Sequence, residues 1–227
     1  MQIQTFDGIL RALFCLLVFG ILVLIGEYLR RKNYISGELA RKFAHTTTGT
    51  WAALWPLFLD LHSISIIALT LTAAALVLRF ILPLKSIYSV KRISMGEILI
   101  GLGIAISSWI AVSGSIYTAS VLVIAWGDSM AAIVGTRFGK KNGFRVMGAK
   151  KSVLGSLAFF IVSAGIIFGF FMYEKSLAID FSSFELVKSI GYSLGLAVIL
   201  TVAEILGAYG LDNLSLPIIT AVLLNLI

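Results

Sequence analysis

The chain has 227 residues, of which 59% are apolar and only 13% are charged, and its mean hydropathy is +1.02. So much apolar sequence excludes a soluble globular protein and predicts a polytopic helical membrane protein. The single cysteine, Cys15, excludes an internal disulfide. The formal net charge of +7 comes from basic residues in the loops of this membrane protein, and no nucleic-acid partner is expected.

Several apolar runs are long enough to cross the hydrocarbon core, which takes about 17–25 residues of helix. They cover residues 8–29, 43–59, 62–82, 97–113, 115–136, 153–173, 186–207 and, less strongly, 214–227. The loops between them are brief, so we expect an all-α bundle of seven or eight transmembrane helices in one domain, residues 1–227. Basic residues follow the first run in place of a small-residue cleavage site, so a secretory signal peptide is not expected.

The basic residues predict the orientation, because loops on the cytoplasmic side carry an excess of Lys and Arg. Fifteen of the eighteen lie at alternate connections, between the first and second, third and fourth, and fifth and sixth runs. The exceptions are Arg11, Lys175 and Lys188. We therefore expect the N-terminus outside and these basic loops in the cytoplasm.

Asp128 is the strongest candidate for a functional residue, because it lies inside an apolar segment. An acid within a membrane helix is costly unless it faces a cavity, a cation or a partner. Six Lys and Arg residues follow within the next 23 positions with no acid among them. A helix-to-helix hydrogen bond is the structural alternative, but the basic loop favours a Mg²⁺ ligand or a base beside a phosphate-rich ligand.

The basic loop is interleaved with glycines, and glycine allows backbone N–H groups to approach phosphate oxygens. We expect Ser152 to cap the next helix, with the positive end of its dipole facing the site. A stripe of small residues (Gly127, Ala131, Gly135 and Gly139) precedes the loop, and it suits close helix packing as well as it suits a ligand. The spacings of a Walker A loop and of a dinucleotide-binding fingerprint are absent.

Other polar residues fall on the same predicted side of the membrane. Arg41, Lys42 and His45 open the second run, and Arg41 and His45 share one helix face. A histidine in such a place is more often a structural hydrogen-bonding group than a catalyst. The other polar residues on this side are three acids and one amide, namely Glu97, Glu204, Asp212 and Asn213. Oxygen donors from several helices suit Mg²⁺, which shares its shell with substrate phosphates.

Four segments together resemble one family. RKFAH at 41–45, GDSMAAIVGTRFGK at 127–140, KKSVLGS at 150–156 and AEILGAYGLDNLSLPI at 203–218 are similar to the dolichol kinase, phytol kinase and CTP-dependent diacylglycerol kinase family of membrane lipid kinases. The resemblance spans about residues 38–218. It implies transfer of the γ-phosphoryl group of a nucleoside triphosphate, usually CTP, to a lipid alcohol.

The resemblance implies a role for each matching position. Asp128, with Glu204 or Asp212, would hold Mg²⁺, and Arg41 or Lys42 would steady the transferring group. The resemblance does not identify the base, and the residues themselves leave three candidates to take the proton of the alcohol: Glu97, His45 and Asp128. The expected nucleotide-binding residues are Gly135, Lys140, Lys150, Lys151, Ser152, Gly155 and Asn213. The lipid alcohol would enter from the bilayer and the triphosphate from the cytosol.

Two alternatives remain. Membrane cytidylyltransferases that make CDP-diacylglycerol share part of this pattern, but their C-terminal signature is rich in paired aspartates, which this chain lacks. A transporter for an anionic solute could use the same charged residues, although transporters usually place polar groups at the membrane midplane and often contain repeats. Here the polarity is confined to one membrane face.

Overall fold

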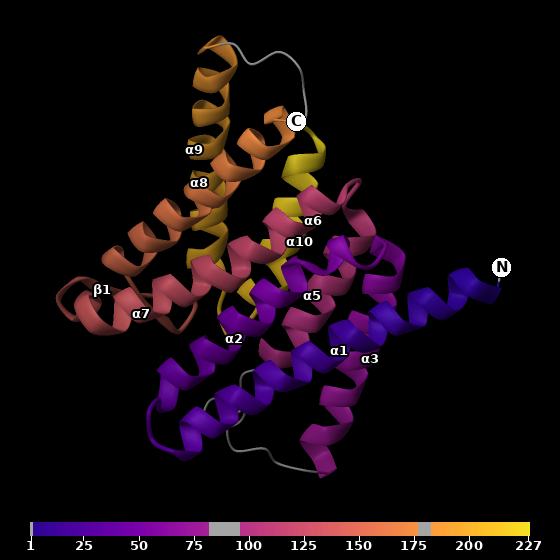
Figure 1. The fold of residues 1–227 in the computed structure, drawn as a ribbon. Coiled ribbons are helices and arrows are strands. Elements are labelled where there is room, and N and C mark those ends of the chain that lie inside the picture. The colour runs from indigo at the N-terminus through magenta and orange to yellow at the C-terminus, as the bar shows by residue number, and fades with distance from the viewer. Residues whose placement is uncertain (1, 82–95, 177–182) are drawn as a thin grey trace.

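The computed structural model describes residues 2–81, 96–176 and 183–227 (Figure 1). The side chains of residues 2–6, 78–81, 97 and 183–184 lie outside that description. The elements are α1 Gln2–Arg31, α2 Gly37–Ala53, η1 Trp55–Leu57, α3 Leu61–Ile81, α5 Gly96–Ile110, α6 Gly114–Leu122, η2 Val123–Asp128, α7 Ser129–Phe138, η3 Gly139–Asn142, β1 Gly143–Val146, β2 Ala149–Ser152, α8 Val153–Ser176, α9 Ser183–Leu206 and α10 Asp212–Asn225.

Each predicted apolar run corresponds to a helix or to a continuous set of helical segments. Helix α2 is shifted relative to its predicted run: it covers Gly37–Ala53, whereas the run covers residues 43–59. Its first turns contain Glu38, Leu39, Ala40, Arg41 and Lys42, which are good helix formers although several are charged. Hydropathy therefore omitted the charged first turns of α2 and included the short helix η1 that follows it.

Four helical stretches are long and apolar enough to cross a membrane within the described residues. They are Asp7–Arg31, Gly114–Asn142, Val153–Ser176 and Glu185–Leu206, and Leu61–Val77 and Ile98–Ile110 are shorter apolar helices. These lengths and compositions make the chain a helical membrane protein. In the protein, 56% of the apolar stretch Gly114–Asn142 is buried, but only 6% of that in α1. The stretch α6–η2–α7 is therefore the central helix, and α1 lies at the periphery.

The central helix passes between α2, α8 and α10 and is packed on each side (Figure 1). Tyr117, Val121, Val123 and Ile124 on this helix are completely buried, as is Phe159 of α8. Helix α3 packs on α5, α5 on α10, and α8 on both α7 and α9. Helix α8 approaches η2 so closely that only glycine fits at position 127, where an added Cβ would lie 2.8 Å from the Phe159 ring.

The central helix contains a turn of π-helix, Val123–Asp128, where an unbroken α-helix was predicted. A π turn inserts one extra residue, so the backbone hydrogen bonds connect residues five apart instead of four. Such turns are frequent at functional sites. Asp128 is the last residue of this one.

A short β-hairpin forms where the sequence predicted a glycine-rich loop. Strands β1 and β2 are antiparallel, and Met147 and Gly148 between them both have positive φ, as a two-residue type I′ turn requires. Ser152 ends β2, and its Oγ accepts a hydrogen bond from Gly155 N at 3.1 Å. The predicted cap of the following helix is thereby confirmed.

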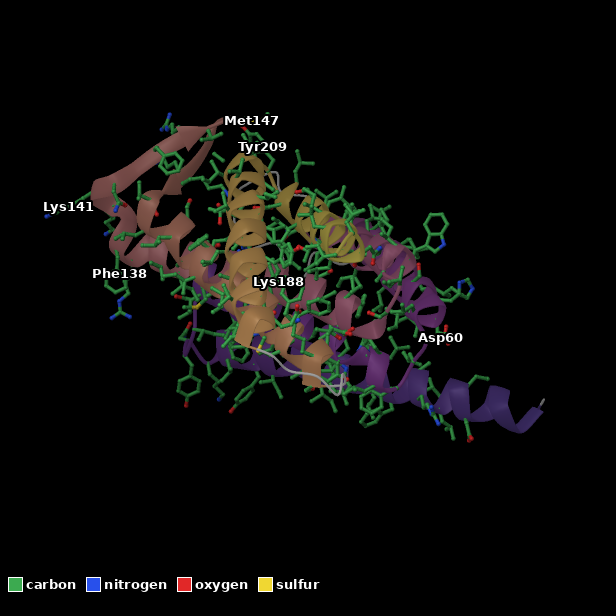
Figure 2. All side chains as sticks on the ribbon, turned by 90° about the horizontal axis from the view of Figure 1, so that it is seen from above. Asp60, Phe138, Lys141, Met147, Lys188 and Tyr209 are labelled. Atoms are coloured by element: carbon green, nitrogen blue, oxygen red, sulfur yellow. The ribbon has the colours of Figure 1, made fainter. Side chains whose placement is uncertain are left out.

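Contacts between loops divide the molecule into two ends. At one end, a Cβ on Gly114 would meet Pro56 at 2.9 Å, and the Asn225 amide donates to Ile110 O at 2.9 Å. At the other end, a Cβ on Gly148 would lie 2.6 Å from the Tyr209 hydroxyl. Figure 2 shows Met147 and Tyr209 next to each other, far from Asp60. Alternate connections therefore meet at the same end of the bundle.

Candidate active site

A buried ion pair joins α2 to the central helix. Lys42 Nζ donates to Asp128 Oδ2, and these side chains are only 2% and 12% exposed. Burying one of these charges without the other would be costly, so the pair fixes how α2 lies against η2. The sequence placed both residues in the site, and the structure brings them into contact.

The π turn offers backbone carbonyl oxygens to the same face of α2. His45 Nε2 lies 3.2 Å from Ile124 O, and since a carbonyl only accepts, Nε2 carries the proton. Thr46 Oγ1 lies 3.3 Å from Ala125 O and donates to Ser129 Oγ at 2.7 Å. His45 thus satisfies one carbonyl group of the π turn, and its Nε2 also lies 3.7 Å from Asp128 Oδ2.

A second lysine contacts two acids at the junction of α9 and α10. Lys151 Nζ lies 2.5 Å from Glu204 Oε1 and 3.8 Å from Asp212 Oδ2, and it also donates to Glu204 O at 2.8 Å. Lys151 is half-buried and faces this junction, whereas Lys150, the residue before it on β2, is exposed. Alternation along the strand therefore separates two lysines that are adjacent in the sequence.

The two lysine–carboxylate groups form one electrostatic unit. Burial raises the pKa of the Asp212 carboxyl to about 6, with a further contribution from the negative charge of Asp128 and opposing contributions from Lys151 and Lys42. Helix α10 also packs against η2. The site therefore combines residues from α2, η2, β2, α9 and α10, which are distant in the sequence.

The junction of α9 and α10 contains buried oxygen atoms that could act as metal ligands. Glu204 Oε2 and Asn213 Oδ1 are buried, and neither has a hydrogen-bond partner in the described part of the chain. Asn213 Nδ2 donates to Gly96 O at 3.2 Å, which directs the amide. No group of three or more His, Cys, Asp or Glu side chains that could hold a metal ion occurs within residues 2–81, 96–176 and 183–227. Two carboxylates and an amide oxygen nonetheless fit Mg²⁺, which keeps several waters.

The predicted glycines lie where α7 and α8 approach each other. A Cβ on Gly155 would lie 2.8 Å from Ala131 O and 3.3 Å from Gly135 Cα, and one on Gly135 would lie 2.9 Å from Ser152 Oγ. Gly139 also abuts the Ser152 side chain. These residues make the crossing of α7 and α8 possible, so the small stripe has a packing role.

The other predicted residues are distributed around this centre. Arg41 forms a 2.5 Å ion pair with Glu38 one turn earlier on α2. Lys140 and Lys150 are exposed on η3 and β2. Glu97 lies in the first turn of α5, and its side chain is outside the described part of the structure.

Sequence reasoning missed the π turn and the contacts of Thr46 and Ser129. The π turn leaves no periodicity signal in so short a segment. Thr46, however, is four residues after Lys42 and so lies on the same helix face. That spacing could have identified it as a neighbour of Asp128.

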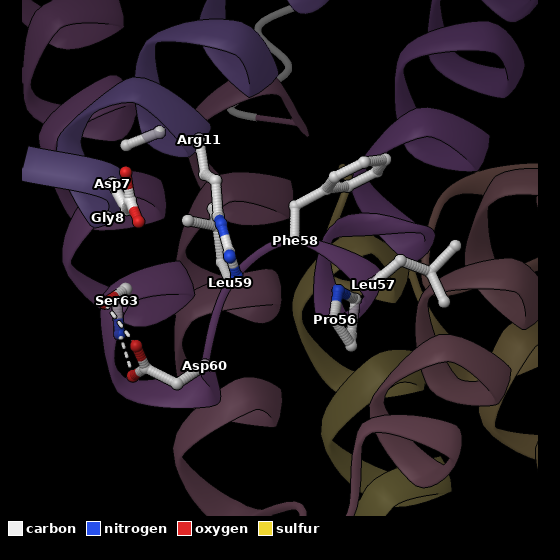
Figure 3. Close-up of a pocket in the computed structure, with 10 residues that line it drawn as sticks. Asp7, Gly8, Arg11, Pro56, Leu57, Phe58, Leu59, Asp60 and Ser63 are labelled. Atoms are coloured by element: carbon white, nitrogen blue, oxygen red, sulfur yellow. Dashed lines mark hydrogen bonds between the residues drawn. The ribbon is translucent and has the colours of Figure 1, made fainter. Parts of the chain in front are cut away.

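A separate pocket of about 540 Å³ lies at the opposite end of the bundle, between α1, η1 and the start of α3 (Figure 3). Asp7, Arg11 and Asp60 contribute its charged lining. Ser63 N and Oγ donate to the Asp60 carboxylate at 2.9 and 2.7 Å, and these hydrogen bonds lower the pKa of Asp60. The predicted site residues do not line this pocket.

Comparison with known proteins agrees with the geometry. No family model matches the chain, and no solved structure is similar to it at a significant level. A phytol kinase of Synechocystis sp. is 30% identical over 209 residues, which cover 90% of this chain and 85% of that protein. The aligned region includes nearly all of the chain and therefore most of the residues described above. The chain thus belongs to the polyprenol and phytol kinase family of membrane lipid kinases.

Proposed function

We propose that this protein phosphorylates a membrane lipid alcohol by transferring the γ-phosphoryl group of a nucleoside triphosphate. The observation that carries the proposal is a pair of buried or half-buried lysine–carboxylate groups, Lys42 with Asp128 and Lys151 with Glu204 and Asp212, in a chain similar to a phytol kinase. Phosphoryl transfer needs mainly positioning and neutralisation of charge. Alternating cationic and anionic groups in a nearly dry site supply both.

Each group has a role in this proposal. Lys42 and Lys151 would neutralise phosphate oxygens, as would Arg41 nearby on α2. The carboxylates of Asp128, Glu204 and Asp212 would hold Mg²⁺, which would screen the charge of the triphosphate. The alcohol proton would pass to a base of the site. Asp128, Glu97 and His45 are the proposed bases, and His45 would accept the proton at Nδ1, because its Nε2 donates to Ile124 O.

The phosphoryl acceptor and the phosphoryl donor are proposed on different grounds. An isoprenoid alcohol such as phytol or a polyprenol is the proposed acceptor, because the relative is a phytol kinase. CTP is the proposed donor, because the motifs at 127–140 and 150–156 resemble those of enzymes that usually use CTP. Lys151 and Ser152, at the start of α8, would lie on the nucleotide side of the site.

We also propose the position of the site relative to the bilayer. The chain would cross the membrane seven or eight times with its N-terminus outside. The basic hairpin would then face the cytoplasm, because cytoplasmic connections carry the excess of Lys and Arg. Water-soluble triphosphate would reach the site from the cytosol, and the alcohol from the bilayer.

One experiment tests both the transfer of phosphate to the lipid and which phosphorus atom of the nucleotide is attacked. Purified protein is incubated with phytol or a polyprenol, Mg²⁺, and CTP labelled with ³²P at either the α or the γ position. Attack at the γ-phosphorus releases CDP, so label should enter the lipid from γ-³²P-CTP and not from α-³²P-CTP. Label that enters the lipid from the α position alone would overturn the proposal in favour of a cytidylyltransferase. No labelled lipid with any alcohol or nucleotide tried would remove the kinase assignment.

A further inference from the structure

The position of the Lys151 ammonium group is the starting observation. It is surrounded by Glu204 Oε1 at 2.5 Å, Glu204 O at 2.8 Å and Asp212 Oδ2 at 3.8 Å. Carboxylate and carbonyl oxygens of this kind are also the ligands of hard divalent cations. The ammonium group therefore occupies a position that is built for a cation.

Two buried oxygens of the α9–α10 junction lack a partner among the described residues, and one of them belongs to the carboxylate that holds Lys151. Glu204 Oε2 and Asn213 Oδ1 are buried, belong to residues that are 3% and 5% exposed, and have no hydrogen-bond partner among the described residues. A buried carboxylate oxygen without a partner is costly. A divalent cation with its bound waters would satisfy more of these oxygens than Lys151 does.

We infer that Lys151 occupies part of the proposed Mg²⁺ site in the ligand-free state, and that it must leave Glu204 and Asp212 before these two acids can bind the cation together with Asp128. The inference rests on the proposed function in taking Mg²⁺ with a nucleotide as the ligand. The arriving phosphates are then the new partner for Lys151. Cation binding therefore depends on nucleotide, because the phosphates draw Lys151 from the acids.

The neighbouring residue provides a matched control. Lys150 is on the same strand and has the same charge, but its side chain is exposed on the other face of β2. Removing Lys150 changes the net charge of the hairpin as much as removing Lys151 does. Only the Lys151 substitution empties the position between Glu204 and Asp212.

The test measures cation binding in the absence of nucleotide. Free Mn²⁺ is followed by electron paramagnetic resonance as it is titrated into wild type, Lys151→Met and Lys150→Met proteins in detergent. If Lys151 occupies the site in about nine molecules of ten, its removal should tighten Mn²⁺ binding about tenfold. Lys150→Met should bind Mn²⁺ as wild type does, and Glu204→Gln added to Lys151→Met should abolish the gain.

Lys151→Met leaves the Glu204 carboxylate without a cation and so could unfold the protein. A second variant, Lys151→Gln, keeps the test valid in that case. Lys151→Gln keeps a donor for the Glu204 carbonyl, and Mg²⁺ should raise its thermal midpoint more than that of wild type. Equal Mn²⁺ affinity in wild type and both Lys151 variants, or an equal gain in Lys150→Met, overturns the inference. The two proposals fail separately. Absence of label transfer by the wild-type protein would remove the proposed function. The Mn²⁺ titrations decide the role of Lys151 and need no label transfer.

Discussion

Individual charged residues in this protein are stabilised by very few partners. Asp128 is ion-paired with Lys42 and has His45 nearby, and both members of the pair are almost inaccessible to solvent. Removing one member of a buried pair costs about 3–5 kcal/mol, whereas removing both can be nearly neutral. Stability and activity can therefore be separated at this pair.

Asp128→Asn should reduce label transfer at least tenfold and should also lower the thermal midpoint, because Lys42 is left buried without an opposite charge. The double variant Lys42→Met with Asp128→Asn should regain most of the lost stability but none of the activity. Transfer is measured with γ-³²P-CTP in detergent, and folding by thermal unfolding. If the double variant recovers activity together with stability, the pair has only a structural role.

Two elements of the bundle take their positions from residues with small side chains. Helices α7 and α8 cross where Gly135 and Gly155 face each other, and Ser152 caps α8 at the same place. The crossing positions β2, which carries Lys151 toward Glu204. A larger residue at the crossing would therefore disturb both packing and the site.

Gly155→Ala should destabilise the protein by about 1–3 kcal/mol, because the added methyl group would lie 2.8 Å from a backbone carbonyl oxygen that cannot move away alone. Gly165→Ala is the matched control on the same helix, where nothing lies within 4 Å of the added Cβ. That change should be neutral or should stabilise by up to about 1 kcal/mol. Thermal unfolding of both variants is the measurement. Equal midpoints for the two would contradict a tight crossing at Gly155.

At the scale of the whole molecule, alternate connections meet at opposite ends. The hairpin, the α9–α10 junction and the start of α5 gather at one end. The pocket beside Asp60, the start of α6 and the end of α10 lie at the other. The predicted site residues with described side chains are at or near the first end, together with the basic residues of the hairpin.

Thiol labelling tests which end faces the cytoplasm. In a Cys15→Ala background, Lys141→Cys should react with an impermeant thiol reagent only from the cytoplasmic side, and His62→Cys only from outside. Both side chains are exposed, so accessibility of the thiol should not limit the reaction. Figure 2 places Lys141 far from Asp60, the near neighbour of His62 in the sequence. Labelling of both positions from one side would contradict the predicted topology.

The sequence by itself determined the helical membrane class, the approximate limits of the apolar helices and the cap at Ser152. These features depend on local composition and on neighbours three or four residues apart. It also marked Asp128 and Glu204 as members of a site, because charges in apolar segments are costly and so are rarely incidental. The motifs shared with the lipid kinases added Lys42, Lys151 and Asp212.

Only the tertiary structure determined which charged residues form ion pairs. Lys42 and Asp128 are 86 residues apart, and Lys151 and Glu204 are 53 apart, and no local pattern encodes such pairings. The π turn and the hairpin, which separates Lys150 from Lys151, were likewise not predicted. They arise from the packing of α2 and α8 against the central helix, where backbone groups find partners in distant segments of the chain.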